Sequence, residues 1–520
     1  MNLQLPIIPG SKTASKRQAK LEKELRHARS YNEWKTIAQE LDEVTGLNDW
    51  KRDNASPYYD YQLIADRLTR FRRYRLEKKN VELVRLLREG LHHDLGNMGH
   101  PLLYGHAYVG TKKLIEEYIT EVCQCLQYVC EQDFDFLPLA EKIKFFEDTA
   151  HSYGQPALMF SGGATLGLFH TGVCKALHEQ DLLPRVFSGS SAGALMAGML
   201  GTHTDQELIN MYSGDDFYKY AFRFRSVWDV LKGGGIADVQ TLKQFLRQNL
   251  GEYTFEEAYE RTGRHINIVV APFDGSQSPR IMNELTSPYL LMWSAALASC
   301  AVPVLFPPVR LTAKAANGEN IPYMSSLRWV DGSVRSDFPR TRMARLFNVN
   351  YTIASQVNPH IVPFMQKDSE RFRKDLASWP QKIVRDQGKL IAMGAMNFTR
   401  ERLGEVSSIR RMLDHGYGII GQRYYGDVNI VGSYGLRHYT YMLQNPSEKL
   451  FKLLQQEGER ATWPKISSIA THARVGKMLE HCLKTLDQQR IALLQKLLPQ
   501  TEDVQKLLEV EVCRHHIAQI

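Results

Sequence analysis

The sequence predicts an α/β protein with a mainly parallel central sheet, preceded by a helical domain and followed by further helices. Up to about residue 150, apolar residues recur at the three- and four-residue spacing of helices. From Gln155, short apolar runs alternate with helical segments, and after Pro363 helical spacing returns with many basic residues. We therefore expect a helical domain over 1–150, an α/β domain over 151–362 and a basic, mostly helical region over 363–520.

The strands of the middle region are expected in its short apolar runs. These runs are PALMFS, PRVFSG, INIVVAPF, LRWVDGS and YTIASQVNP. Helices between such runs are typical of a parallel sheet, because each crossover must return the chain to the same edge. One later strand-like run, YYGDVNIVGSYG, interrupts the C-terminal helices.

The composition fits a globular protein with at least one sizeable core. Of the 520 residues, 43% are hydrophobic and 23% are charged, which excludes a disordered, collagen-like or coiled-coil chain. The 65 basic and 57 acidic residues give a formal net charge of +8. The surplus lies from Arg340 onward, so it gives no argument for a nucleic-acid partner and leaves an anionic membrane surface to consider.

Cysteine usage and hydropathy favour an intracellular protein without a membrane span. Seven cysteines, an odd number, argue against a disulfide framework, and Cys123, Cys125 and Cys130 have helical flanks and no zinc-site spacing. Three prolines cut the longest apolar stretch, 288–309, and leave about 14 helix-compatible residues, too few to cross a bilayer. The N-terminus shows no signal-peptide pattern. We expect a cytoplasmic protein or one peripherally associated with membranes or lipid droplets.

The strongest motif is PRVFSGSSAGALMAGML, in which an apolar strand leads through GxSxG into a helix. This is the pattern of a nucleophile elbow, which exposes a serine hydroxyl where the helix dipole favours a developing anion. The turn is so tight that a Cβ at Gly189 or Gly193 would collide with neighbouring backbone. Ser191 is therefore the candidate nucleophile.

A second glycine turn lies about thirty residues upstream, in PALMFSGGATLGLFHTG. Gly162, Gly163 and Ala164 can aim successive N–H groups at one anion, and Gly167 lets the next helix approach the sheet. One interpretation is a phosphate cradle and the other is an oxyanion hole for Ser191. The spacing matches neither GxGxxG nor a P-loop, so the neighbouring elbow favours the oxyanion hole.

The third motif is LRWVDGS, where an apolar strand ends in Asp331 and Gly332. A carboxylate at this end of a strand lies where open α/β sheets form active sites, although an ordinary Asp-Gly turn has the same pattern. His360, after a later strand, would complete a Ser-Asp-His order, and His170 is a second candidate. A lone histidine is more often structural, and a carboxylate can itself act as the base.

The three motifs in this order resemble the patatin-like phospholipase family, whose pattern is a glycine-rich loop, GxSxG and DG[GA]. The corresponding segments here are SGGATLG, GSSAG and DGS, and ALASCAVPVLFPPV resembles a further segment of that family. Trp34, Trp50 and the segments LYGHAYVGTKKLIEEY, SQVNPH and GERATWPKIS resemble the triacylglycerol-lipase branch. That branch carries a helical domain of unknown function before the patatin domain. The resemblance implies a patatin-like three-layer fold.

The resemblance also implies roles for the motif residues. Ser191 would be the nucleophile and Asp331 the proton acceptor, a dyad without histidine, and Gly162, Gly163 and Ala164 would form the oxyanion hole. Leu166 stands where many family members carry Arg or Lys, which removes a positive charge near the site. The resemblance implies no metal and no other cofactor.

We therefore expect a serine acyl-ester hydrolase of water-insoluble lipids, similar to triacylglycerol lipases. Its partners would be a lipid ester and, peripherally, a membrane or lipid-droplet surface. The alternatives are a phospholipase A, a lysophospholipid acyltransferase and, outside enzymes, a nucleotide-binding regulatory protein. Within 371–385, apolar side chains recur at helical spacing among basic ones, which suits either an interfacial contact with lipid or a core-facing helix with a solvated basic face.

Overall fold

The chain was analysed as a computed structural model that describes residues 12–214, 220–223, 236–273, 277–303, 305–332, 338–358, 361–362, 425–442 and 444–497. Its contacts group into two compact units. The first unit comprises Met1–Gln155, Ala344–Asn350 and Trp463–Ile520, and the second comprises Pro156–Met343 and Tyr351–Thr462. The expected division of the chain into a helical domain over 1–150, an α/β domain over 151–362 and a helical region over 363–520 stays a prediction.

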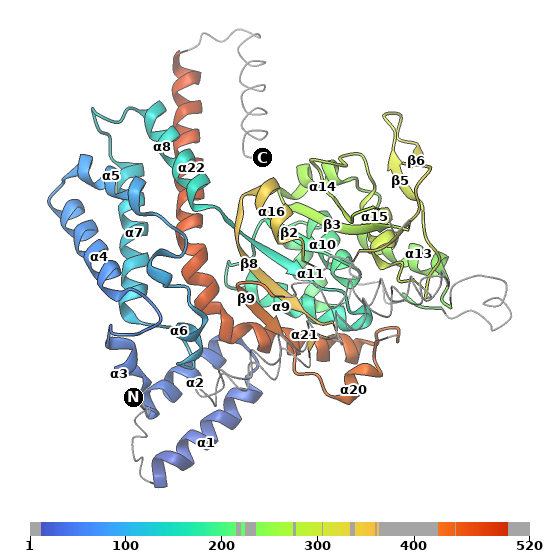
Figure 1. Cartoon of the computed structure of the whole chain (residues 1–520), viewed down its shortest axis with the longest axis horizontal. Helices are drawn as coiled ribbons and strands as arrows, with labels where there is room; N and C mark the ends of the chain where they lie inside the picture. Colours follow the sequence, from blue (N-terminus) through green and yellow to red (C-terminus); the bar gives the residue numbers. More distant parts are fainter. Residues whose placement is uncertain are drawn as a thin grey trace, which may run out of the picture. The chain divides into compact units, whose positions relative to one another are not determined.

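The first unit is helical, as the spacing of its apolar residues predicts. Its helices are α1 (Lys12–His27), α2 (Tyr31–Val44), α3 (Leu47–Arg52), α4 (Tyr61–Leu76), α5 (Asn80–Gly90), α6 (Pro101–Gly105), α7 (Lys113–Glu131), α8 (Leu139–Tyr153) and α22 (Ile466–Leu497), with short 3-10 turns at Leu95–Asn97 and Trp463–Lys465. The long helix α22 runs beside α7 and α8 (Figure 1), so the end of the described chain completes the core begun at its start.

The buried carboxylate of Asp42 is fully paired in the first unit. The Asp42 carboxylate accepts hydrogen bonds from Lys51 Nζ (2.7 Å) and from the N–H groups of Tyr108 (2.8 Å) and Val109 (3.2 Å), which ties α2 to the chain before α7. A buried charge is tolerated when it is satisfied in this way. Cys123, Cys125 and Cys130 are buried thiols of α7, which confirms their interpretation as helix cysteines.

The second unit is built on a mixed but mainly parallel sheet. Its strands are β1 (Gln155–Phe160), β2 (Val186–Gly189), β3 (His265–Pro272), β4 (Arg280–Met282), β7 (Trp329–Asp331), β8 (Val349–Gln356) and β9 (Val428–Val431). The order is β4-β3-β2-β1-β8-β9, with β7 also paired to β3. The pairs β1–β2, β2–β3 and β8–β9 are parallel, whereas β4 and β7 run antiparallel to β3. The late strand-like run is β9, as expected.

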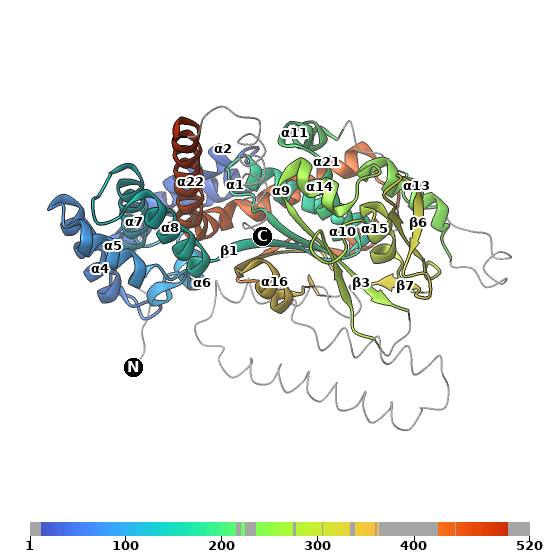
Figure 2. The ribbon, with the colours of Figure 1, turned by 90° about the horizontal axis from the view of Figure 1, so that it is seen from above.

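Helices cover both faces of this sheet, which confirms the three-layer architecture. They are α9 (Phe169–His178), α10 (Ala192–Thr202), α11 (Asp205–Ser213), α13 (Val239–Leu250), α14 (Phe255–Thr262), α15 (Met292–Cys300), α16 (Arg340–Phe347), α20 (Leu436–Tyr439) and α21 (Glu448–Thr462), and a small hairpin joins β5 (Leu311–Lys314) to β6 (Asn320–Tyr323). Figure 2 shows α9, α10 and α15 on one face and α16 on the other. All eight residues of β3 are buried, as a strand covered on both faces requires.

The longest apolar stretch, 288–309, forms the buried helix α15 and the loop after it. Among the described residues, no helix combines the length and apolar character needed to cross a membrane. The basic segment 371–385, His360 and Ser333 lie outside the described residues.

Candidate active site

Ser191 lies on a sharp turn between β2 and α10. Its backbone has φ 52° and ψ −122°, a left-handed conformation that costs free energy for any residue with a side chain. A Cβ at Gly189 would overlap the Gly193 carbonyl, and one at Gly193 would overlap the Phe160 carbonyl. The two glycines therefore allow the close backbone contacts that hold the elbow, as the sequence predicts.

Two hydrogen bonds from the end of α15 fix the Ser191 backbone. Its N–H donates to Ser299 Oγ (2.9 Å), and that hydroxyl donates to the Val269 carbonyl of β3 (2.7 Å). The Cys300 thiol donates to the Ser191 carbonyl (3.2 Å). Ser299 and Cys300 end α15, so this helix ties the elbow to the central strand. The strained conformation is thus held by neighbours on both sides of the peptide.

Asp331 ends the short strand β7, with its side chain buried. Its N–H donates to the Ala301 carbonyl (3.1 Å). Burial and, secondarily, the charge of Asp331 raise the pKa of the Cys300 thiol, so the carboxylate lies near the cysteine that contacts Ser191. A Cβ at Gly332 would overlap the Val269 carbonyl, which keeps this turn against β3.

Ser191 and Asp331 therefore approach the same two elements, β3 and the end of α15. Among the hydrogen bonds of the described residues, none joins Ser191 Oγ to the Asp331 carboxylate. Catalytic hydrogen bonds commonly tighten only when substrate is bound, so this arrangement is compatible with proton transfer between the two groups.

The predicted oxyanion loop follows β1 and leads through the 3-10 turn η2 (Ala164–Leu168) into α9. In the part of the chain that the structure describes, the N–H groups of Gly163 and Ala164 donate no hydrogen bond. Ala164 has φ 51°, and a Cβ at Gly163 would lie 2.6 Å from Val357 Cγ2. Two unpaired donors on one turn can stabilise a developing oxyanion.

Gly167 brings the loop to the elbow. A Cβ at this position would lie 2.5 Å from the Ala192 Cβ, the first side chain of α10. The sequence pattern predicts that Gly167 lets the helix approach the sheet, and the structure adds a close contact with the residue after Ser191. Leu166 is fully buried beside it and does not line the pocket described below.

His170 forms hydrogen-bond contacts with the residue that precedes the oxyanion loop and with β8. Its Nδ1 contacts Ser355 Oγ (2.7 Å) and its Nε2 contacts the Ser161 carbonyl (3.0 Å). Complete burial lowers the pKa of His170 to about 4, against the smaller opposing effect of the Ser161 carbonyl. A neutral His170 therefore supports the residue before Gly162, and both ring nitrogens are engaged away from Ser191.

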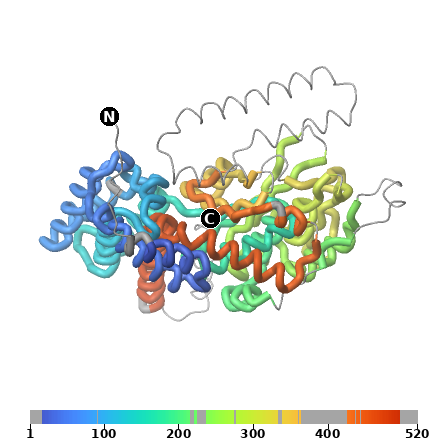
Figure 3. The backbone as a smooth tube through the Cα atoms, turned by 90° about the horizontal axis from the view of Figure 1, so that it is seen from below, coloured from blue at the N-terminus to red at the C-terminus, as the bar shows by residue number. Residues whose placement is uncertain are grey.

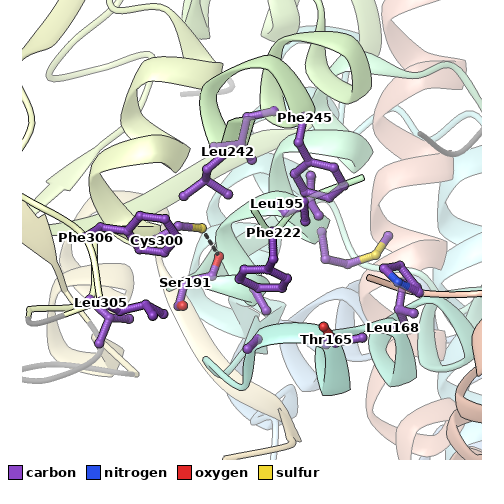
Figure 4. Close-up of a pocket in the computed structure, with 18 of the residues that line it drawn as sticks. Thr165, Leu168, Ser191, Leu195, Phe222, Leu242, Phe245, Cys300, Leu305 and Phe306 are labelled. Carbon is purple, nitrogen blue, oxygen red and sulfur yellow. Dashed lines mark hydrogen bonds between the residues drawn. The ribbon is translucent and has the colours of Figure 1, made fainter. Parts of the chain in front are cut away.

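Ser191 opens on a pocket lined mostly by apolar side chains. We call residues 161–167, 189–193 and 331–332 the catalytic floor. The apolar wall consists of nine residues: Ala221, Phe222, Leu242, Phe245, Leu246, Val302, Leu305, Phe306 and Pro446. Figure 4 shows Phe222 and Leu195 with Ser191 in this pocket, and the Cys300–Ser191 contact.

Among the residues that the structure describes, no charged side chain lines this pocket, and the polar side chains that line it are Ser191, Thr165 and Thr171, with the thiol of Cys300. No motif in the sequence indicates the apolar wall. Its one signal is the helical spacing of Leu242, Phe245 and Leu246 in α13, which is also typical of core residues. Within the described ranges, no group of three or more His, Cys, Asp or Glu could hold a metal ion.

Two parts of the chain match known protein families. Residues 11–151 match a domain of unknown function (DUF3336), and residues 158–343 match the family described as patatin-like phospholipase. The chain is 35% identical to triacylglycerol lipase 4 of Saccharomyces cerevisiae over 86% of its own length and 51% of the relative. It is 34% identical to triacylglycerol lipase SDP1L of Arabidopsis thaliana, over 90% and 58%.

A shorter relative matches almost from end to end. Triacylglycerol lipase ptl3 of Schizosaccharomyces pombe is 32% identical over 89% of this chain and 96% of its own length. By contrast, the chain spans only about half of the length of triacylglycerol lipase 4 and about three fifths of that of triacylglycerol lipase SDP1L.

Proposed function

Since the chain belongs to the patatin-like phospholipase family, we propose that it hydrolyses acyl esters of water-insoluble lipids, and triacylglycerols in particular. The observation that carries this proposal is the position of Ser191, on a strained elbow that opens on an apolar pocket beside two unpaired N–H groups. The names of the relatives, which are triacylglycerol lipases, support the same substrate class.

In the first step, Ser191 Oγ attacks the ester carbonyl carbon while Asp331 accepts the hydroxyl proton. The carbonyl electron pair moves onto oxygen, and N–H groups of the loop Gly162–Ala164 stabilise that charge. Collapse breaks the bond to the alcohol, which leaves with the proton from Asp331. Water then attacks the acyl-enzyme, gives its proton to Asp331 and releases the fatty acid as the proton returns to Ser191.

The character of the pocket bears on lipid class. None of the lining side chains in the described part of the chain carries a charge. A neutral glyceride therefore leaves no headgroup charge unpaired at the pocket, whereas a phospholipid would. If a lysophospholipid rather than water attacks the acyl-enzyme, the same site performs acyl transfer.

A substrate panel tests the proposal. We expect the purified chain to release fatty acid from triolein faster than from phosphatidylcholine, and Ser191→Ala to abolish both activities. Faster release from phosphatidylcholine would assign a phospholipase A, and acyl transfer to a lysophospholipid in place of release would assign an acyltransferase. Tight nucleotide binding with no ester hydrolysis would contradict the enzyme assignment altogether.

The site of action is proposed as a lipid surface, membrane or droplet, met peripherally. An apolar pocket must receive its acyl chain from a lipid phase, and the charge surplus from Arg340 onward suits an anionic surface. Flotation with vesicles tests this. Binding should increase with phosphatidylserine content and fall with salt, and binding indifferent to both would contradict the electrostatic part.

A further inference from the structure

A short segment far along the chain reaches the catalytic floor. Residues 442 and 444–446 lie between α20 and α21, about a hundred residues beyond the end of the patatin-like match at 343. The Thr165 N–H donates to the Met442 carbonyl (3.1 Å), and the Thr165 hydroxyl donates to the Gln444 carbonyl (2.7 Å). Because Thr165 directly follows Ala164, this segment holds the loop that offers the unpaired N–H groups.

Asn445 links the same segment to the apolar wall. Its Oδ1 accepts from the N–H groups of Ala221 (2.8 Å) and Phe222 (2.7 Å), and its Nδ2 donates to the Phe222 carbonyl (2.8 Å). One amide thus satisfies three backbone groups of a run, 220–223, that has no regular secondary structure. Asparagine suits this position because its short side chain both accepts and donates, whereas aspartate only accepts.

Two of the residues joined by these bonds, Thr165 and Phe222, line the pocket. Pro446, which directly follows Asn445, lines it as well, nearly 300 residues along the chain from Thr165. Figure 4 shows the Phe222 ring in the pocket with Ser191 and Leu195. The position of the Phe222 backbone therefore sets how much space lies beside the nucleophile.

The helix that follows this segment, α21, is packed closely against α9. Gly172 of α9 approaches the Gln455 carbonyl so closely that a Cβ would overlap it, and Gly458 of α21 approaches the Phe169 carbonyl in the same way. Lys175 Nζ donates to Glu459 at 2.9 Å beside this crossing. In Figure 3, α21 belongs to the orange-red segment, which is part of the second unit. The helix that follows residue 446 is thus fixed against the helix that continues from the oxyanion loop.

We propose that Asn445 is a positioning residue that determines acyl-chain specificity, because it fixes the backbone of Phe222 in the pocket wall. The inference rests on the proposed hydrolase function and adds to it a residue outside the matched family domain. Asn445 touches neither the reacting atoms nor Ser191. It acts on selectivity through the backbone groups of Ala221 and Phe222 that it holds.

The test measures kcat/KM for p-nitrophenyl butyrate and p-nitrophenyl palmitate, with fluorophosphonate titration of active sites. Asn445→Ala should change the palmitate-to-butyrate ratio about tenfold, since the pocket wall discriminates by chain length. Phe222→Ala should shift the ratio in the same direction. The double variant should show no further shift, because coupled residues are not additive. Loss of folded protein alone would lower both rates equally and leave the ratio unchanged.

Controls separate the possible failures. Asn317→Ala removes an exposed hairpin asparagine and should leave the ratio at the wild-type value. If Asn445→Ala does not fold, Asn445→Asp carries the test, because it loses the donor to the Phe222 carbonyl at the same size and should still shift the ratio. An unchanged ratio in an active Asn445 variant, or additive shifts in the double variant, would overturn the inference. Activity retained by Ser191→Ala would instead overturn the proposed function.

Discussion

The catalytic floor comes from three short junctions at the ends of strands, whereas the apolar wall comes from segments that stretch from Ala221 to Pro446. On the floor, close backbone contacts exclude any side chain at Gly189, Gly193 and Gly332. The wall consists of apolar side chains that other apolar residues could replace. The difference indicates that the chemistry at this site depends on a backbone held in one conformation. Selectivity depends instead on the volume of wall side chains, which substitution can change.

The largest effect is expected on the floor, from Asp331→Asn. The amide has the size of the carboxylate but cannot accept the Ser191 proton, so kcat should fall by about 10²–10⁴-fold. The loss should be the same for p-nitrophenyl butyrate and palmitate, because the change does not alter the pocket wall. Steady-state kinetics with both esters measure it, and a loss confined to one ester would break the division between floor and wall.

A floor glycine should have the next largest effect. In Gly193→Ala the new Cβ would overlap the Phe160 carbonyl, so the elbow must move, and displacement of a nucleophile by about 1 Å can cost about 10²-fold in rate. Gly105→Ala, where a Cβ would meet nothing within 4 Å, is the matched control and should keep full activity. Titration of active sites separates a smaller fraction of reactive chains from a lower rate at each reactive chain. Full activity of Gly193→Ala would contradict the fixed floor.

On the wall we expect a smaller and selective effect. Leu246→Ala should enlarge the pocket and change the palmitate-to-butyrate ratio of kcat/KM by about tenfold while butyrate hydrolysis changes little. Leu208→Ala, equally buried in α11 but away from the pocket, should destabilise the fold by a similar few kcal/mol and leave the ratio unchanged. Equal ratios for the two variants would show that the wall does not select chain length.

The smallest effect on activity is expected at His170, which supports the floor without touching Ser191. The pKa of His170 is about 4 in the folded chain and near 6.5 when unfolded, so the unfolded chain binds more protons between these values. The free energy of unfolding should therefore fall as pH drops through this window, by about 2 kcal/mol between pH 7.5 and pH 5.

His170→Asn should lack this part of the pH dependence, as measured by denaturant unfolding at the two pH values. The exposed His481→Asn serves as its control and should retain the wild-type dependence. If His170→Asn and wild type lose stability in parallel, the account of a buried, neutral histidine is wrong.

The floor could be predicted from the sequence because each part is local. A strand, a glycine turn and a helix follow one another within about twenty residues at Ser191 and again at Gly163. Residues that are neighbours in the sequence therefore determine the geometry of each turn. The parallel core of the sheet followed from the same alternation. The roles assigned to Ser191 and Asp331 remain predictions until the enzyme is assayed.

The wall could not be predicted, because its contacts are made between distant residues. Leu242 and Phe245 have the spacing of any amphipathic helix, and nothing around Asn445 indicates that its amide would bond to Phe222. The antiparallel pairing of β7 with β3 and the packing of α22 on α7 also depend on tertiary contacts, which local patterns do not encode.

The central claim is that Ser191 is the nucleophile of a lipid hydrolase. A fluorophosphonate probe followed by peptide mass spectrometry, with triolein hydrolysis measured on the same samples, tests it most directly. We predict one adduct per chain, on Ser191, formed in step with the loss of hydrolysis, and neither labelling nor hydrolysis in Ser191→Ala. An adduct on another residue, or triolein hydrolysis that survives in Ser191→Ala, would contradict the account.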